Sequence, residues 1–152
     1  MRMGGRQSTL EGAPNLVLGN GTLSAIATTP SVTRVAGFVA STRRPVPYSS
    51  AGGLIGVAPG EREWGAQPAF AAVSDQGVMR PGLPSIGTVS GSGARLIGTS
   101  AAAALASRFM VANAAKGLKL TEGLVDLPAP QPDESELSLR ARLGSGLVPD
   151  HP

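Results

Sequence analysis

Residues 97–116, with the sequence IGTSAAAALASRFMVANAAK, carry the strongest secondary-structure signal in this chain. Alanine and leucine have high helix propensities, and Gly117 offers a natural end because glycine is favoured just past the last helical turn. The pattern predicts a helix from Ser100 to Ala115. Its first two turns have no polar face, so we expect the start of this helix to be buried on all sides.

The helix is preceded by a Gly98-Thr99-Ser100 motif that has a chemical interpretation. A serine in the first turn projects its hydroxyl from a fixed point, beside unpaired backbone N–H groups and the positive end of the helix dipole. Both features favour an oxyanion that forms next to the hydroxyl, as acyl transfer requires. Serine and threonine are also common helix caps, so from these three residues alone a purely structural cap remains an alternative.

Several segments upstream of the helix predict strands. Residues 15–18 are a short apolar run that stops at a Gly-Asn-Gly turn, and 32–40 are rich in β-branched residues. Residues 69–74 are apolar and predict a strand or an extended segment. Residues 54–68 contain several glycines and prolines and predict a loop, and 75–94 predict a long loop or a loose hairpin.

The chain divides into three parts by composition. We expect a flexible N-terminal arm over 1–14, the main body of the domain over 15–125, and a Pro-rich linker with a closing turn and strand over 126–152. Within the last part, 135–142 predict a short helix. The predicted fold class is α/β, with a parallel sheet packed against the Ser100 helix.

Composition excludes several kinds of site. The 152 residues include no Cys and one His, His151, which rules out disulfide scaffolds, thiolate metal sites, cysteine nucleophiles and multi-histidine metal sites. The 13 basic and 10 acidic residues are interleaved, so the net charge of +3 does not indicate a nucleic-acid partner. No apolar run reaches about 18 residues, so we expect no transmembrane helix, and the N-terminus does not resemble a signal peptide. Oligomeric state and localisation are not indicated.

The serine motif and four other segments resemble the subtilases, the subtilisin-like serine peptidases, and they occur in the order found in that family. The resemblance covers about residues 16–148. The matching segments are ATTPSVTRVAG at 27–37, PYSSAG at 47–52, AFAAVS at 69–74, IGTSAAAA at 97–104 and GSGLV at 144–148.

The resemblance implies a serine-type endopeptidase acting on polypeptides. It makes Ser100 the nucleophile, supported by Gly98 and Thr99, and implies that the amide of Asn20 stabilises the oxyanion. Asn20 also fits a plain turn residue before Gly21, and this alternative stays open. Family members often bind Ca²⁺, but the sequence shows no evident Ca²⁺ loop or other cofactor site.

Two departures from the family bear on activity. Ala104 stands where the family usually has proline, which alters helix packing rather than chemistry. The family triad has Asp and His upstream of the serine, whereas His151 is the only histidine here and lies in a tail that is a poor place for a preorganised base. We therefore expect the chain to resemble the C-terminal part of a subtilase domain, with Asp and His preceding residue 1, and to be inactive alone.

Two alternatives to an enzyme follow from the same sequence. A non-catalytic, subtilase-like remnant could serve as a binding or structural module. A mostly disordered basic segment with incidental motif matches is supported by 21 Gly and 13 Pro. The positive mean hydropathy of +0.10 argues against disorder.

Overall fold

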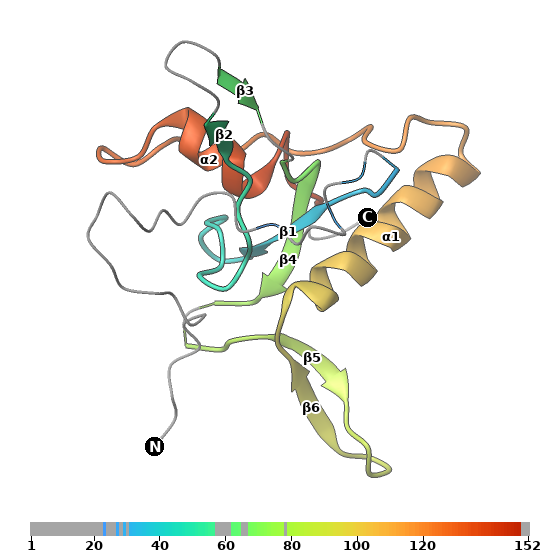
Figure 1. The fold of residues 1–152 in the computed structure, drawn as a ribbon. Coiled ribbons are helices and arrows are strands. Elements are labelled where there is room, and N and C mark those ends of the chain that lie inside the picture. Colours follow the sequence, from blue (N-terminus) through green and yellow to red (C-terminus); the bar gives the residue numbers. More distant parts are fainter. Residues whose placement is uncertain are drawn as a thin grey trace.

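The computed structural model describes residues 23, 27, 29, 31–56, 62–64, 67–77 and 79–149. This part of the chain is mixed α/β, with a small parallel sheet, two antiparallel hairpins and two helices (Figure 1). The elements are β1 (Val35–Val39), β2 (Leu54–Gly56), β3 (Arg62–Trp64), β4 (Phe70–Asp75), β5 (Leu83–Ile86), β6 (Gly93–Leu96), α1 (Thr99–Ala115) and α2 (Glu136–Leu143).

The parallel pairing of β1 with β4 forms the centre of the fold. Val35 lies opposite Phe70 and Phe38 opposite Val73, after which the register shifts by one residue. The sheet continues past β4 through Leu147, which forms an isolated parallel bridge to Ala71 and an antiparallel bridge to 125. The closing segment predicted after residue 143 therefore contributes single bridges to the sheet rather than a full strand.

One face of β4 packs against α1. Phe70 and Ala72 point to this side and form a buried cluster with Ala102 and Ala106 of the helix and with Val148. All five are at most 7% exposed. Alanine at the two helical positions lets α1 approach the sheet closely, because a larger side chain would hold the helix away from it.

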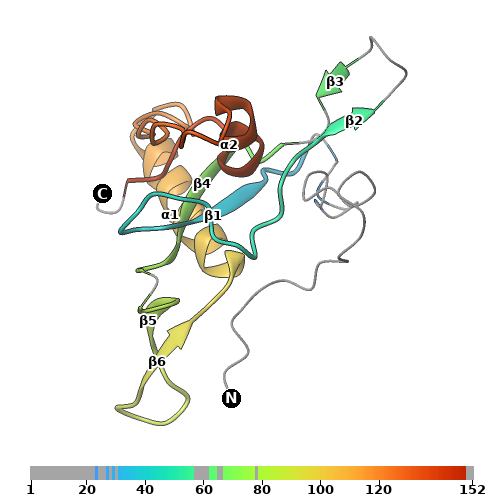
Figure 2. The same cartoon turned by 90° about the vertical axis from the view of Figure 1, so that its left-hand side faces the viewer.

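The opposite face of β4 packs against α2. Ala71 and Val73 alternate with the residues that face α1, as successive strand residues must. They are buried with Phe38 of β1 and with Leu139 and Leu143 of α2. Figures 1 and 2 show β1 and β4 between the two helices. Every residue of β4 is buried, as expected for a strand covered on both faces.

The structure confirms several predictions. The 32–40 segment contains β1, and β4 begins and ends one residue later than the 69–74 segment predicted for it. The helix α1 begins one residue before Ser100 and ends at Ala115. The short helix predicted over 135–142 is α2, with the Ser135 side chain accepting a hydrogen bond from the Ser138 N–H at 3.0 Å. The hairpin alternative for 75–94 is confirmed by β5 and β6, which extend away from the sheet in both views (Figure 2).

Two predictions were wrong. Residues 54–68 are not all loop, because β2 and β3 pair there as a short antiparallel hairpin. Each of these strands has only three residues, which is too short for a clear local sequence signal.

The second wrong prediction concerns the burial of the helix. Only one side of α1 is buried: Ala103 and Ala104 are exposed, and Val111 is 68% exposed. The first two turns of the helix have no polar face, but among the described residues no element covers their outer side. The expectation that the start of this helix is buried on all sides therefore does not hold within the part of the chain that the structure describes.

Four predictions lie outside the described residues. They are the flexible arm over 1–14, the strand over 15–18, the candidate oxyanion donor Asn20 and the terminal His151.

Gly144 ends α2 in a conformation that generates a testable prediction. Its φ is 76° and its ψ is −144°. A Cβ there would lie 2.5 Å from the Pro68 carbonyl oxygen and 2.6 Å from the Phe70 nitrogen. Both the backbone conformation and the lack of space oppose any side chain, so we expect Gly144→Ala to lower the free energy of unfolding by about 2 kcal/mol or more. Urea unfolding followed by circular dichroism measures the change.

The matched control is Gly93→Ala. A Cβ at Gly93 meets nothing within 4 Å, and its φ is not positive. We expect this variant to unfold within about 0.5 kcal/mol of the parent. Equal stabilities for the two variants would contradict the steric role of Gly144.

Candidate active site at the start of the Ser100 helix

The helix α1 begins without a side-chain cap. Its N-cap residue is Gly98, with φ 133° and ψ 161°, and no side chain accepts a hydrogen bond from the first turn. The Gly98 carbonyl accepts the N–H of Ala101 at 3.1 Å, the first hydrogen bond of the helix. Ser100 is thus the second residue of the helix, and its side chain caps no first-turn amide. This differs from the helix cap that the sequence offered as an alternative. The first turn also contains no acidic residue.

Ser100 is exposed, and its hydroxyl has no hydrogen-bond partner among the described residues. The hydroxyl therefore lies free beside the uncapped amides of the first turn, where the helix dipole favours negative charge. In the described part of the chain, no carboxylate or other ionisable side chain contacts it as a base. The geometry offers an accessible nucleophile and electrostatic support for an anion, but no proton acceptor.

A partly buried polar cluster supports the turn that leads into the helix. The Tyr48 hydroxyl donates a hydrogen bond to Asp75 Oδ1 at 3.0 Å, and the same oxygen accepts the backbone N–H of Gly82. Asp75 is 7% exposed. The backbone of Gly98 also faces the phenol. The cluster therefore joins the loop after β1, the end of β4, the start of β5 and the entry to α1.

The cluster raises the pKa of Tyr48. Burial is the largest cause, followed by the hydrogen bond to Asp75 and the negative charge of that carboxylate. The side chain of Ser74 and the backbone of Gly98 act in the opposite direction, and the resulting pKa is about 12. Tyr48 therefore keeps its proton at neutral pH and is no candidate for the missing base.

Ser74 adds an unusual feature to this cluster. Its Oγ is buried and has no partner with normal hydrogen-bond geometry among the described residues, although the side chain lies near the Tyr48 phenol. The Ser74 Oγ also lies only 2.3 Å from the position that a Cβ on Gly37 would take. The absence of a side chain at residue 37 thus makes room for the Ser74 hydroxyl.

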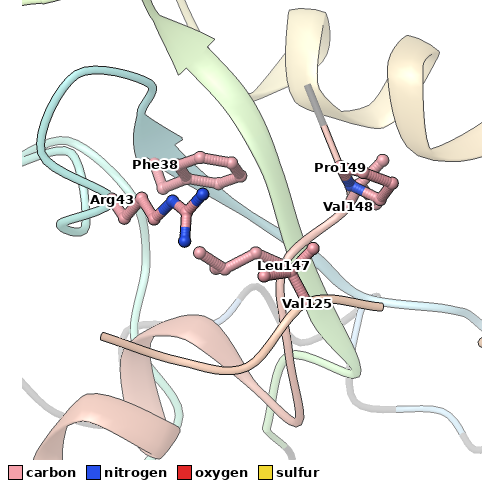
Figure 3. Close-up of a pocket in the computed structure, with 6 residues that line it drawn as sticks. All are labelled: Phe38, Arg43, Val125, Leu147, Val148 and Pro149. Carbon is pink, nitrogen blue, oxygen red and sulfur yellow. The ribbon is translucent and has the colours of Figure 1, made fainter. Parts of the chain in front are cut away.

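A small cavity lies on the α2 side of the sheet, lined by Phe38, Arg43, Leu147 and three neighbouring residues (Figure 3). The Arg43 guanidinium lies beside the Phe38 ring and points toward Leu147. The cavity volume of about 20 Å³ has room for about one water molecule. It is too small to be a substrate pocket.

The sequence-predicted residues separate into two groups. The structure places Gly98, Thr99 and Ser100 together at the helix start, whereas Asn20 and His151 lie outside the described residues. Sequence reasoning missed the Tyr48–Asp75 contact, because the two residues are 27 positions apart and neither belongs to a recognisable pair motif.

The described residues do not assemble a metal site. No group of three or more His, Asp or Glu side chains lies close enough to hold an ion within the part of the chain that the structure describes. These residues thus offer no cluster of carboxylates for the Ca²⁺ that the subtilase resemblance suggests. In the same part of the chain, no helix is long and apolar enough to cross a membrane.

Comparisons with known proteins give no identification. Neither a protein-family model, nor a curated protein, nor a solved structure was found to match this chain.

The pKa of Tyr48 is directly measurable, because it is the single tyrosine of the chain. We expect its phenolate absorbance in the near ultraviolet to appear near pH 12 rather than near its usual pKa of 10.0. Because the folded-state pKa is raised, the stability linked to this group is fully present below pH 10 and declines as the pH rises from 10 to 12.

The contribution of Asp75 is tested by Asp75→Asn. This variant removes the negative charge and weakens the hydrogen bond, so the Tyr48 pKa should move down toward 10.0. Asp126→Asn, which changes an exposed acid, is the control and should leave the titration unchanged. A Tyr48 midpoint that is the same in all three proteins would contradict the Tyr48–Asp75 contact.

Proposed function

We propose that this chain is the nucleophile-bearing part of a subtilisin-like serine endopeptidase, with Ser100 as the nucleophile. The observation that carries the proposal is the position of Ser100: exposed and unpartnered within the described structure, in the first turn of a helix whose N-terminus has no side-chain cap. A serine that served only to cap the helix would have its oxygen engaged with a first-turn amide.

The proposed chemistry assigns one step to each group. Ser100 Oγ attacks the carbonyl carbon of a peptide bond, and its proton passes to a histidine held by an aspartate. The Ser100 backbone N–H donates to the oxyanion, and the side-chain amide of Asn20 is the second donor assigned by the subtilase resemblance. The histidine then protonates the departing amine. The histidine and the aspartate come from a polypeptide segment outside this sequence.

The exposed surface around Ser100 supports a missing partner. The outer face of α1 repeats at helical spacing through Ser100, Ala103, Ala104, Ser107 and Val111, all exposed and uncharged. The β5–β6 hairpin and the segment before the helix expose further large apolar side chains. An isolated two-stranded hairpin has only marginal stability in water. These exposed side chains are Ile86 at 88%, Leu96 at 49% and Ile97 at 56%. A segment that brings the histidine to Ser100 would cover this apolar face.

The proposal predicts that the isolated chain does not hydrolyse peptides. Without a base, the Ser100 hydroxyl stays protonated and is a weak nucleophile. A fluorogenic peptide library and an unfolded protein substrate test this, together with labelling by a fluorophosphonate, which also needs an activated serine. A hydrolysis rate that disappears in Ser100→Ala would contradict the prediction.

The complementary experiment uses the protein made in its source cell with a C-terminal tag. A tagged polypeptide much larger than 15.2 kDa would contain an upstream segment able to supply the histidine and aspartate. Ser100→Ala should then reduce proteolysis by about 10⁴-fold or more. Ser107→Ala is the matched control, because Ser107 lies on the same face of α1 and its hydroxyl only bonds the Ala103 carbonyl at 2.9 Å.

A second candidate function is a non-catalytic binding or structural module. The observation that favours it is the lack of any ionisable partner for Ser100 among the described residues. A tagged band near 15.2 kDa, with no copurifying polypeptide that supplies a base, would favour this module over the peptidase. So would full function of the native protein with Ser100→Ala.

A further inference from the structure

A cleft of about 450 Å³ lies between α1 and the carboxyl end of the sheet, on a different side of the helix from Ser100. At 100° per residue, Leu105, Phe109 and Ala112 are more than 90° around the helix from Ser100. The cleft continues over Val73 of β4 and reaches the segment after Leu147. Its volume falls within the range of small-molecule sites in proteins, about 300–1,000 Å³.

The walls of the cleft are mostly apolar. Val73, Leu83, Leu105 and Phe109 contribute side chains from the sheet, the hairpin and the helix. Leu83, Leu105 and Phe109 also pack against the two core clusters, so the walls belong to the folded body. An alkyl chain placed here would exchange water for hydrocarbon contacts.

Two cationic side chains, Arg108 and Lys116, also line the cleft, and no acidic side chain does. Both are exposed, and neither forms an ion pair within the described part of the chain, where the salt bridges are Arg44–Glu134 and Arg140–Glu136. Arg108 lies in the middle of α1. Lys116 is the C-cap, where the helix dipole disfavours an anion. Arg108 is therefore the stronger anchor for a negative group.

The backbone groups at the cleft argue against a peptide occupant. The N–H groups of Ala40, Gln76 and Val148 already donate to carbonyls within the fold. The α1 residues at the cleft begin at Leu105, past the first turn, so their N–H groups bond to carbonyls within the helix. A bound peptide would bring its own N–H and C=O groups into an apolar cleft with few partners, which costs free energy. An unbranched hydrocarbon chain has no such groups.

From these observations we propose that the cleft binds an amphipathic carboxylate, an alkyl chain with one anionic head group. The chain lies on Leu105, Phe109 and Val73, and the carboxylate meets the guanidinium of Arg108, with Lys116 at the rim. This site is independent of the Ser100 chemistry, since no cleft residue belongs to the serine motif.

The test titrates decanoate into the full chain below its micelle concentration and follows binding by calorimetry and by amide chemical shifts. We expect decanoate to bind saturably and to shift the amide signals of the cleft residues. Its affinity should be about tenfold or more above the affinity of the neutral decanol, because a charge-assisted hydrogen bond adds to the apolar contact. Decylammonium should bind more weakly than decanol. Circular dichroism confirms that the chain stays folded during the titration.

Variants separate the charged anchor from the apolar walls. Arg108→Gln should lower the affinity for decanoate about tenfold and leave the affinity for decanol unchanged. The control is Arg80→Gln, at an exposed arginine outside the cleft, and it should change neither affinity. Ala112→Leu should fill the cleft and weaken both ligands. Ala103→Leu is its matched control, because Ala103 is exposed and lies 180° around α1 from Ala112.

Three results would overturn the proposal. They are no saturable decanoate binding, equal affinities for decanoate and decanol, and decanoate binding that neither Arg108→Gln nor Ala112→Leu changes. If Ala112→Leu does not fold, the Arg108 and Arg80 variants still decide the question. An acidic peptide that binds with the same cleft shifts while decanoate does not would assign the cleft to a polypeptide instead.

Discussion

The parallel pairing of β1 with β4 is the constraint on which the rest of this structure depends. β4 has both faces covered, so its alternate side chains divide the described core into two clusters, one with α1 and one with α2. Small side chains at Ala72, Ala102 and Ala106 bring α1 close to the sheet. Because α1 is fixed in this way, the position of its first turn is fixed as well, and with it the place where the Ser100 hydroxyl leaves the fold.

The Tyr48–Asp75 contact extends this constraint to the loops. The pair connects the segment after β1 to the end of β4, and through Gly82 and Gly98 it reaches both ends of the β5–β6 hairpin. A hydrogen bond to a buried carboxylate is stronger than one between neutral groups, so it suits a junction that must hold several loops in register. The serine motif thus rests on a polar support as well as on the alanine contacts of α1.

The sequence predicted the elements with strong local signals and missed features that depend on distant partners. α1 and β4 were predictable because propensity and apolar runs are local properties. The β2–β3 hairpin was missed because its strands are three residues long and surrounded by glycine and proline. The burial of α1 was overestimated because an apolar helix face shows what could be covered, not what covers it. Tyr48 and Asp75 could not be paired, since nothing local relates residues that are 27 positions apart.

The conformation of Gly98 limits how this helix start can be stabilised. A φ of 133° with a ψ of 161° is a backbone region used almost only by glycine, whereas the capping residues Ser, Thr, Asp and Asn adopt extended backbone at the N-cap. A cap therefore cannot be introduced at residue 98 without rebuilding the turn. The burial of Ala101 and Ala102, rather than a capping side chain, therefore stabilises the first turn. The turn that presents the Ser100 hydroxyl thus depends on packing, where other helices use a capping side chain.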